Sequence, residues 1–205
     1  MFIVIEGMDG SGKSTQIALL KEKLLAAEKK IRITREPGGT PIGEMLREIV
    51  LSPENKEMAA ETEALLYAAS RAQHVSEVIN PSLARGEIVI SDRYVVSSYV
   101  YQGIARNLGM DAVKQINDFA IKGRMPDLTI FLFVGENTAL QRKIRQKELD
   151  RLESESDSFH QRVNNGFRKV AEEYKFPKLI IQADGSPEEV HDQIWERVKK
   201  ELKLT

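Results

Sequence analysis

The stretch FIVIEGMDGSGKST, at residues 2–15, decides the fold of this chain. Its first five residues are mostly Ile, Val and Phe, as in a strand that is buried on both faces. Residues 7–14 follow the pattern G-x-x-x-x-G-K-S, and apolar residues at helical spacing come directly after them. Glycines allow successive backbone N–H groups to turn toward one anion, and the first turn of a helix adds further unpaired N–H groups. The stretch therefore predicts a strand, a phosphate-binding loop and a helix.

This pattern is the P-loop, which cradles the phosphates of a nucleotide. Lys13 brings a full positive charge to the β and γ phosphates, and the Ser14 hydroxyl can bind Mg²⁺. Guanine-specific proteins add an N-K-x-D tetrad, but the pair Asn55-Lys56 is followed by Glu57-Met58, so we expect ATP. The residues expected to contact ATP include the whole loop and one position beyond it: Gly7, Met8, Asp9, Gly10, Ser11, Gly12, Lys13, Ser14 and Thr15.

The rest of the chain repeats the alternation of strand and helix. Short apolar segments typical of buried strands recur after the first one, at 31–35, 87–91, 128–134 and 179–182. Helical spacing lies between them, as in Met45 and Ile49 or Val190 and Ile194. Such alternation favours right-handed crossovers and an α/β fold. We expect a P-loop NTPase fold with a five-stranded parallel sheet flanked by helices, in a single domain over residues 1–205.

Composition narrows the class of protein. Thirty Lys and Arg balance 31 Asp and Glu, which argues against a dedicated nucleic-acid binder. Cysteine is absent, so disulfides and thiolate metal sites are excluded. The longest apolar run, 128–134, is far shorter than the roughly 20 residues of a membrane helix, and the first residues lack the basic region of a signal peptide. We therefore expect no membrane partner and a cytoplasmic location.

A second group of polar residues follows the predicted strand at 87–91. Asp92 and Arg93 come directly after it, and ligands of open parallel sheets bind at the carboxyl ends of strands. We expect Asp92 to lie beside the P-loop and to share a metal ion with Ser14. Arg93 can hold a phosphate with two N–H groups at once.

Several motifs, in the same order, resemble those of thymidylate kinases. Residues 92–103 resemble the family block D-R-Y-x-x-S-S-x-x-Y-Q-G, and the segments 35–39, 68–71, 126–130 and 148–153 are also similar to family motifs. The resemblance covers nearly the whole chain. It implies a transferase that moves a phosphoryl group from ATP to dTMP and forms dTDP for dTTP biosynthesis. It also implies Mg²⁺ as cofactor and a homodimer formed through helices on one face of the sheet.

The resemblance assigns residues to the phosphate and sugar of dTMP. Arg35 and Arg93 match positions that hold the acceptor phosphate, and Arg47 matches another position near it. Asp9 resembles the carboxylate that contacts the 3′-hydroxyl, a role that explains a negative charge inside a phosphate-binding loop. Tyr101 matches the ring that crowds C2′ and disfavours ribonucleotides.

The base would be recognised by a different set of residues. Tyr67 corresponds to the aromatic that stacks on thymine. Arg71 matches a donor to O4, and Gln102 matches an amide that faces N3. Ser98, in the same block as Gln102, completes the predicted dTMP site.

A charged segment near the end of the chain resembles the lid of this family. Residues 142–153 hold five Lys or Arg against three Asp or Glu, and we expect the lid at about 142–155. Gly10 occupies the P-loop position where some members carry an arginine, so the chain resembles the bacterial type that uses lid arginines instead. The resemblance then implies Arg142 near adenine. The cations expected at the transferring phosphate are Lys13, Arg93, Arg145, Lys147 and Arg151.

Other functions remain to be weighed against this one. A deoxynucleoside kinase needs a carboxylate base and shows Glu-Arg-Ser where this chain has Asp92-Arg93-Tyr94. A P-loop regulatory or partition protein would need no acceptor site, and another monophosphate kinase would read a different base.

The three histidines are scattered and are predicted to be structural or exposed. A monophosphate is mostly dianionic at neutral pH, so the expected reaction needs no general base.

Overall fold

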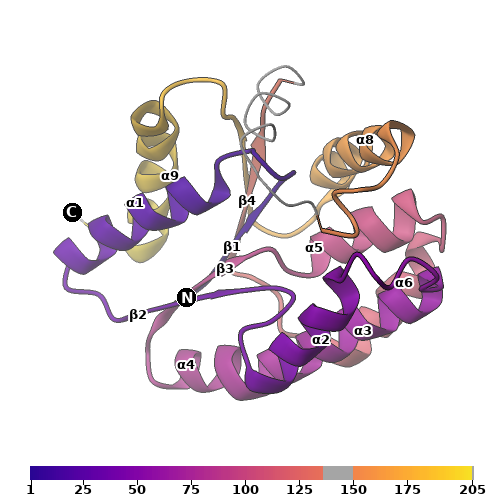
Figure 1. The fold of residues 1–205 in the computed structure, drawn as a ribbon. Helices are drawn as coiled ribbons and strands as arrows, with labels where there is room; N and C mark the ends of the chain where they lie inside the picture. The colour runs from indigo at the N-terminus through magenta and orange to yellow at the C-terminus, as the bar shows by residue number, and fades with distance from the viewer. Residues whose placement is uncertain (136–149, 205) are drawn as a thin grey trace.

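The computed structural model describes residues 1–135 and 150–204. Within them lies a sheet of five parallel strands in the order β2-β3-β1-β4-β5 (Figure 1). The strands are β1 (Phe2–Glu6), β2 (Ile31–Arg35), β3 (Ile88–Asp92), β4 (Leu128–Phe133) and β5 (Lys178–Gln182). The predicted fold class is confirmed. One boundary matters for the site, because β3 extends to Asp92, one residue further than the apolar pattern suggested.

The register of the strands brings their carboxyl ends together. Asp92 pairs with Ile5 on one side and with Arg35 on the other. Glu6 pairs with Phe131 of β4. The ends of β1, β2 and β3 therefore form one continuous edge, from which the P-loop and the segments after Arg35 and Asp92 emerge.

Helices cover both faces of the sheet (Figure 1). One face carries α1 (Lys13–Ala26) and α9 (Pro187–Leu202), whose Leu20, Leu24 and Ile194 pack against alternate residues of the strands. The described helices of the other face are α2 (Pro41–Leu51), α3 (Ala60–His74), α4 (Asn80–Ala84), α5 (Val95–Ser98), α6 (Met110–Ile121) and α8 (Asp157–Glu173), with π-helical turns at Val75–Ile79 and Tyr99–Ala105. Strands covered on both faces explain the unbroken apolar runs in the sequence.

The second helix departs from a simple amphipathic pattern. Met45 and Ile49, whose spacing predicted this helix, are 56% and 46% exposed, and Ile42 is 47% exposed. Leu65 of α3, which packs against α2, is also exposed. The side chains of Ile42, Met45 and Ile49 therefore point away from the sheet, whereas Val50, on the second apolar pair of this helix with Leu46, is buried. None of the described helices is both long and apolar enough to cross a membrane.

Candidate active site

The P-loop connects β1 to α1 and is shaped by its glycines. Gly7 has φ +150°, and a Cβ at this position would lie 2.5 Å from the carbonyl oxygen of Leu132. Gly12 adopts φ +96° directly before the helix. A side chain would therefore strain the loop at Gly12 and would strike the neighbouring strand at Gly7.

Lys13 is buried in the centre of the loop. Its Nζ donates to the carbonyl oxygens of Gly7 and Met8 at 3.1 and 3.0 Å. Burial and the nearby charge of Arg93 lower the pKa of Lys13. The cleft beside it has a volume of about 500 Å³ and is lined by residues 9–16 and by Arg35, Arg47, Asp92 and Arg93. Most of the residues predicted to contact ATP thus line one cleft. Met8 lines the neighbouring cavity, and Gly7 lines neither but accepts a hydrogen bond from Lys13.

The residues predicted to bind a metal, Ser14 and Asp92, both line this cleft. The Oδ1 atom of Asp92 is buried and has no hydrogen-bond partner within the described part of the chain. Unpaired carboxylate oxygens are ligands that Mg²⁺ prefers, and Mg²⁺ usually takes the rest of its shell from water and substrate phosphates. The residues present therefore fit Mg²⁺. Among the described residues no group of three or more His, Cys, Asp or Glu could hold a metal without such outside ligands.

Arg93 stands where the P-loop cleft meets a second cavity, and it lines both. Its Nη2 donates to Asp9 Oδ1 at 2.7 Å and its Nη1 donates to Ser97 Oγ at 3.2 Å. The guanidinium also lies 5.4 Å from the centre of the Tyr101 ring. Burial acts to raise the pKa of Asp9, but the charges of Arg93 and Lys13 outweigh it and hold that pKa well below its ordinary value. Asp9 is therefore ionised at neutral pH.

Glu6, the last residue of β1, is a functional candidate that the sequence interpretation missed. It is completely buried, and burial raises its pKa to about 7 against the opposing effect of the Ser97 hydroxyl and Arg93. Its Oε1 accepts from the backbone N–H groups of Tyr94 and Ser97, and its Oε2 accepts from Ser97 Oγ. A carboxyl residue at the end of an otherwise apolar strand was the available signal.

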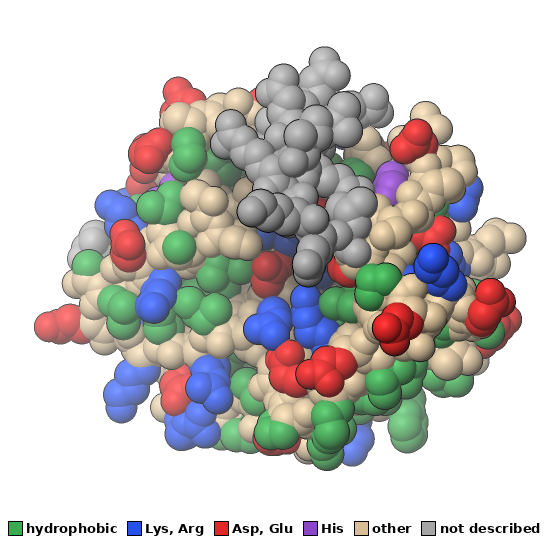
Figure 2. Space-filling view, in the orientation of Figure 1, with side chains coloured by type: hydrophobic (Ala, Val, Ile, Leu, Met, Phe, Trp, Pro, Cys, Tyr) green, Lys and Arg blue, Asp and Glu red, His purple; other side chains and the backbone are tan. Residues whose placement is uncertain are grey.

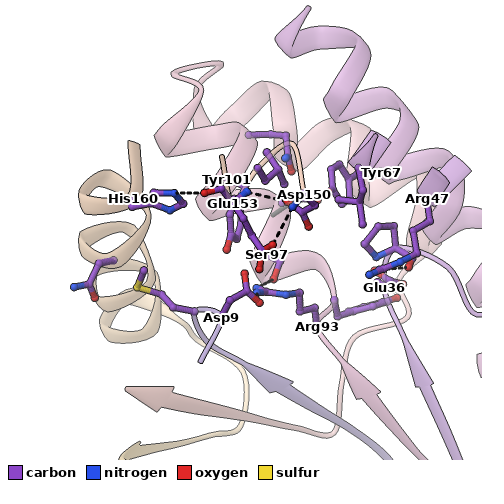
Figure 3. Close-up of a pocket in the computed structure, with 18 of the residues that line it drawn as sticks. Asp9, Glu36, Arg47, Tyr67, Arg93, Ser97, Tyr101, Asp150, Glu153 and His160 are labelled. Carbon is purple, nitrogen blue, oxygen red and sulfur yellow. Dashed lines mark hydrogen bonds and ion pairs between the residues drawn. The ribbon is translucent and has the colours of Figure 1, made fainter. Parts of the chain in front are cut away.

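The second cavity has a volume of about 560 Å³ and lies between the sheet edge and α3, α5 and α8. Figure 3 shows Arg93 and Asp9 at one end of it and Tyr67 at the other side, with Tyr101 and Asp150 between. Each of Tyr67, Arg71, Ser98, Tyr101 and Gln102 lines this cavity, as does Arg47. The structure therefore brings together the residues predicted for dTMP, except that Arg35 lies on the P-loop side.

Arg71 is held in place by a buried network. Its Nε donates to Glu36 Oε2 at 2.7 Å, its Nη1 donates to the side chains of Ser98 and Asn117, and its Nη2 donates to the Tyr94 carbonyl at 3.0 Å. These four bonds leave one of the five guanidinium N–H groups without a partner in the described residues. Arg71 therefore lines the cavity as an oriented donor.

The carboxylate that orients Arg71 is itself held by a histidine. Glu36 Oε1 lies 2.8 Å from His74 Nδ1, and His74 Nε2 lies 2.6 Å from Thr34 Oγ1. His74 is completely buried. It thus has the structural role predicted for it. The sequence interpretation placed Glu36 in a motif but gave it no role.

Gln102 presents an acceptor to the same cavity. Its Nε2 donates to Glu63 Oε1 at 2.8 Å, while its buried Oε1 has no partner among the described residues. Glu63 is buried and also pairs with Arg106 and Arg151. The amide is therefore fixed with its oxygen free to accept a hydrogen bond from a ligand.

One of the four predicted lid cations, Arg151, lies within the described residues. Arg142, Arg145 and Lys147 lie outside the described residues. Arg151 is buried, donates from Nη2 to Glu63 at 2.7 Å and from Nε to the Val50 carbonyl at 2.9 Å, and lines neither cavity. In this arrangement Arg151 stabilises the packing beside α2 and α3 and does not face the P-loop.

Basic and acidic side chains meet near the middle of the face drawn in Figure 2. Arg35 Nη2 pairs with Glu44 at 2.8 Å, and Arg47 Nη1 donates to the Pro37 carbonyl at 2.9 Å. With Arg93 these two arginines line the P-loop cleft. Three guanidinium groups beside the P-loop suit the binding of an anion such as a phosphate.

A parallel sheet, a P-loop and a second cavity that meets it at Arg93 define a P-loop phosphotransferase with separate donor and acceptor sites. The model of the thymidylate kinase family matches residues 5–194 of the chain. This chain belongs to the thymidylate kinase family.

Curated relatives agree with this assignment. The thymidylate kinase of Finegoldia magna is 47% identical over 200 residues, which cover 98% of each chain. The thymidylate kinase of Lactobacillus helveticus is 48% identical and covers 98% of this chain and 96% of its own. That of Halothermothrix orenii is 45% identical, with 97% and 96% covered. A deoxynucleoside kinase is therefore not favoured.

Proposed function

We propose that this chain transfers the γ-phosphoryl group of ATP to dTMP and forms dTDP, a step toward dTTP. The observation that carries the proposal is the position of Arg93, which lines both the P-loop cleft and the cavity that contains Tyr67, Arg71 and Gln102. Two anionic ligands placed in these cavities would meet at this guanidinium. Membership of the thymidylate kinase family supports the same reaction.

The donor site would be the P-loop cleft. Its backbone N–H groups and Lys13 would hold the ATP phosphates, and the segment with Ala183, Gly185 and Pro187 lines the far side, where adenine would lie. The contact of Arg142 with adenine stays a prediction. So do the roles of Arg145 and Lys147 at the transferring phosphate.

The acceptor site would read thymine by its shape and its edge. Tyr67 offers a flat ring to stack on the base. The free Oε1 of Gln102 can accept from N3–H, and the remaining N–H of Arg71 can donate to O4. Cytosine has no N3–H and carries a donor in place of O4, so the same two groups would reject it.

The chemistry needs no base from the protein. An oxygen of the dianionic dTMP phosphate attacks the γ-phosphorus, the bond to the bridging oxygen breaks, and ADP leaves with the electron pair. Arg93 and Arg47 would hold the attacking phosphate, and Lys13 would offset charge on the donor. Mg²⁺, held by Asp92 and Ser14, would supply further positive charge to the ATP phosphates when bound.

We also propose a homodimer, for which the exposed apolar side chains of α2 and α3 are suited. Ile42, Met45, Ile49 and Leu65 lie at the surface, and a contiguous apolar patch on a soluble protein commonly marks an interface. A cytoplasmic enzyme of one domain, without nucleic-acid or membrane partners, remains our expectation. Sedimentation of the full chain and of an Ile49→Lys variant would test the interface, because the dimer should dissociate in the variant.

The proposed reaction is tested by measuring ADP release with Mg·ATP and a panel of acceptors: dTMP, dUMP, AMP, CMP and thymidine. We expect dTMP to be preferred and thymidine to give no product. Arg71→Ala should raise the KM for dTMP about a hundredfold, since it removes a buried, oriented donor, and should leave the KM for ATP nearly unchanged. Equal ADP release with dTMP, AMP and CMP would reject the proposal.

A further inference from the structure

The turn that presents Arg93 has a backbone conformation that needs support. Arg93 adopts φ +69°, in the left-handed region that residues other than glycine rarely occupy. Such conformations persist where the surrounding structure holds them, and they often occur at functional sites. Here the Arg93 N–H donates to the Ile5 carbonyl at 3.0 Å, and Ser91 Oγ donates to the Arg93 carbonyl at 2.8 Å.

Glu6 holds the other side of this turn. One of its oxygens accepts from the backbone N–H groups of Tyr94 and Ser97 at 2.8 and 3.3 Å. The other accepts from the Ser97 hydroxyl at 2.7 Å. No water reaches the carboxyl group, because the residue is completely buried. The segment after Arg93 is therefore tied to the strand that leads into the P-loop.

The Ser97 hydroxyl connects Glu6 to the Arg93 guanidinium through two hydrogen bonds. A serine hydroxyl has one hydrogen and two lone pairs. Because the hydrogen is donated to Glu6, the lone pairs remain to accept from Arg93 Nη1 at 3.2 Å. When Glu6 is ionised it can only accept, so the Ser97 hydrogen points to Glu6 and the Ser97 lone pairs are left for Arg93.

We propose that Glu6 is a positioning residue for the acceptor phosphate, acting through Ser97 on the Arg93 guanidinium. This inference rests on the proposed function, since it assigns Arg93 to the phosphate of dTMP. Glu6 itself lines neither cavity. Its contribution is to fix the direction in which Arg93 offers its N–H groups.

The Glu6→Gln variant tests this role, because glutamine keeps the size of the side chain but replaces one acceptor oxygen with an NH₂ donor. The amide oxygen can still accept from the two backbone N–H groups, but the amide NH₂ then faces Ser97 Oγ and donates to it. The Ser97 oxygen must then accept from both the amide and Arg93, and its hydrogen loses the Glu6 acceptor that oriented it. We expect the Kd and KM for dTMP to rise about tenfold, with a smaller change in kcat and an ATP KM within about twofold.

Thymidine, used as a competitive inhibitor, supplies the decisive comparison. It carries the same base and sugar as dTMP but no phosphate, so its affinity should change less than about twofold in Glu6→Gln. Val198→Ala, in the core between α1 and α9, is the matched control. It should lower the unfolding midpoint while keeping the ratio of dTMP to thymidine affinity at the wild-type value.

Ser97→Ala keeps the test decisive if Glu6→Gln fails to fold. Loss of the hydroxyl should by itself lower the preference for dTMP over thymidine, and in this background Glu6→Gln should add little to that loss. Equal loss of dTMP and thymidine affinity, or no loss of either, would overturn the inference. If the wild-type chain gave no ADP with dTMP, the proposed function would fail first and the inference would fall with it.

Discussion

The P-loop cleft takes eight consecutive residues, 9–16, from one loop and the helix that follows it. The acceptor cavity takes its lining from the strand edge, α2, α3, the segment 93–102 and residues after 150. In the cleft the backbone does most of the binding, and Lys13 is fixed by carbonyls of the same loop. In the cavity the expected binding groups are long side chains, and two of them, Arg71 and Gln102, are held by the buried carboxylates of Glu36 and Glu63.

Because of this difference, we expect substitutions of buried charged residues to affect the two sites unequally. Arg71 depends on Glu36, which lines both cavities, whereas Gln102 depends on Glu63, which lines neither of them. Removing one partner of a buried charged pair leaves the other unpaired, which costs more than the pair contributes. Changes far from a ligand should therefore weaken the acceptor site while they leave the donor site intact.

The largest effect is expected at the donor site. Lys13→Met should lower kcat/KM about a thousandfold, because it removes the buried charge that would face the ATP phosphates. Steady-state kinetics would measure this, with Lys21→Met on the exposed side of α1 as the control. Binding of dTMP without ATP should change little. A parallel loss of dTMP binding would show that the two sites are not separable.

The next effect concerns Glu6, at the end of β1, where the two sites meet. Its pKa is raised to about 7 in the folded protein, above the ordinary value of 4.5, so the folded state binds its proton more tightly than the unfolded state. Stability from this group is therefore present below pH 4.5 and is lost as the pH rises to about 7. The loss is on the order of 3 kcal/mol.

Urea unfolding between pH 5 and 8 would measure this dependence against Glu6→Gln. The variant lacks the titrating group, so the difference in unfolding free energy between the two proteins should change in favour of the variant as pH rises. A constant difference over that range would mean that Glu6 does not change its charge there.

A smaller effect is expected from Glu63→Gln. The change weakens the interactions of residue 63 with Gln102, Arg106 and Arg151 but keeps the side-chain volume. The KM for dTMP should therefore rise about tenfold. Thymidine affinity should fall by the same factor, since the base end is affected. This pattern is the opposite of that expected for Glu6→Gln. An effect confined to the KM for ATP would contradict the division into two sites.

The smallest effect is expected for Glu44→Gln. The Arg35–Glu44 pair is exposed on both sides, and exposed ion pairs contribute little. The KM for dTMP should change less than about twofold, and the unfolding midpoint should stay constant within error. A tenfold change would show that exposed carboxylates also position the acceptor site.

The same contrast explains which parts of the molecule the sequence predicted. The P-loop is contiguous, so its glycines, Lys13, the preceding strand and the start of the following helix appear together in fourteen residues, 2–15. The partners of Arg71 lie 23 to 46 positions away along the chain, and no spacing rule connects them. Those residues could be named only through the resemblance to thymidylate kinases, and their buried partners Glu36 and Glu63 were not assigned a role.

Arg151 also shows what the sequence alone could not predict. In a run of charged residues it suggested a cation at the phosphates, yet its guanidinium is satisfied by Glu63 and by the Val50 carbonyl. Composition indicates that charges are present but not which way they point. Likewise Met45 and Ile49 correctly predicted a helix, but their spacing did not say that the apolar face would point away from the sheet.

The ion pair between Asp9 and Arg93 should reduce the binding of common anions to Arg93. An ion such as inorganic phosphate or sulfate must compete with an attached carboxylate for the guanidinium, and it gains no stacking on Tyr67 and no contact with Gln102 in return. A nucleotide that fits the whole cavity brings those contacts with it. We therefore expect inorganic phosphate and sulfate to compete weakly with the acceptor for Arg93.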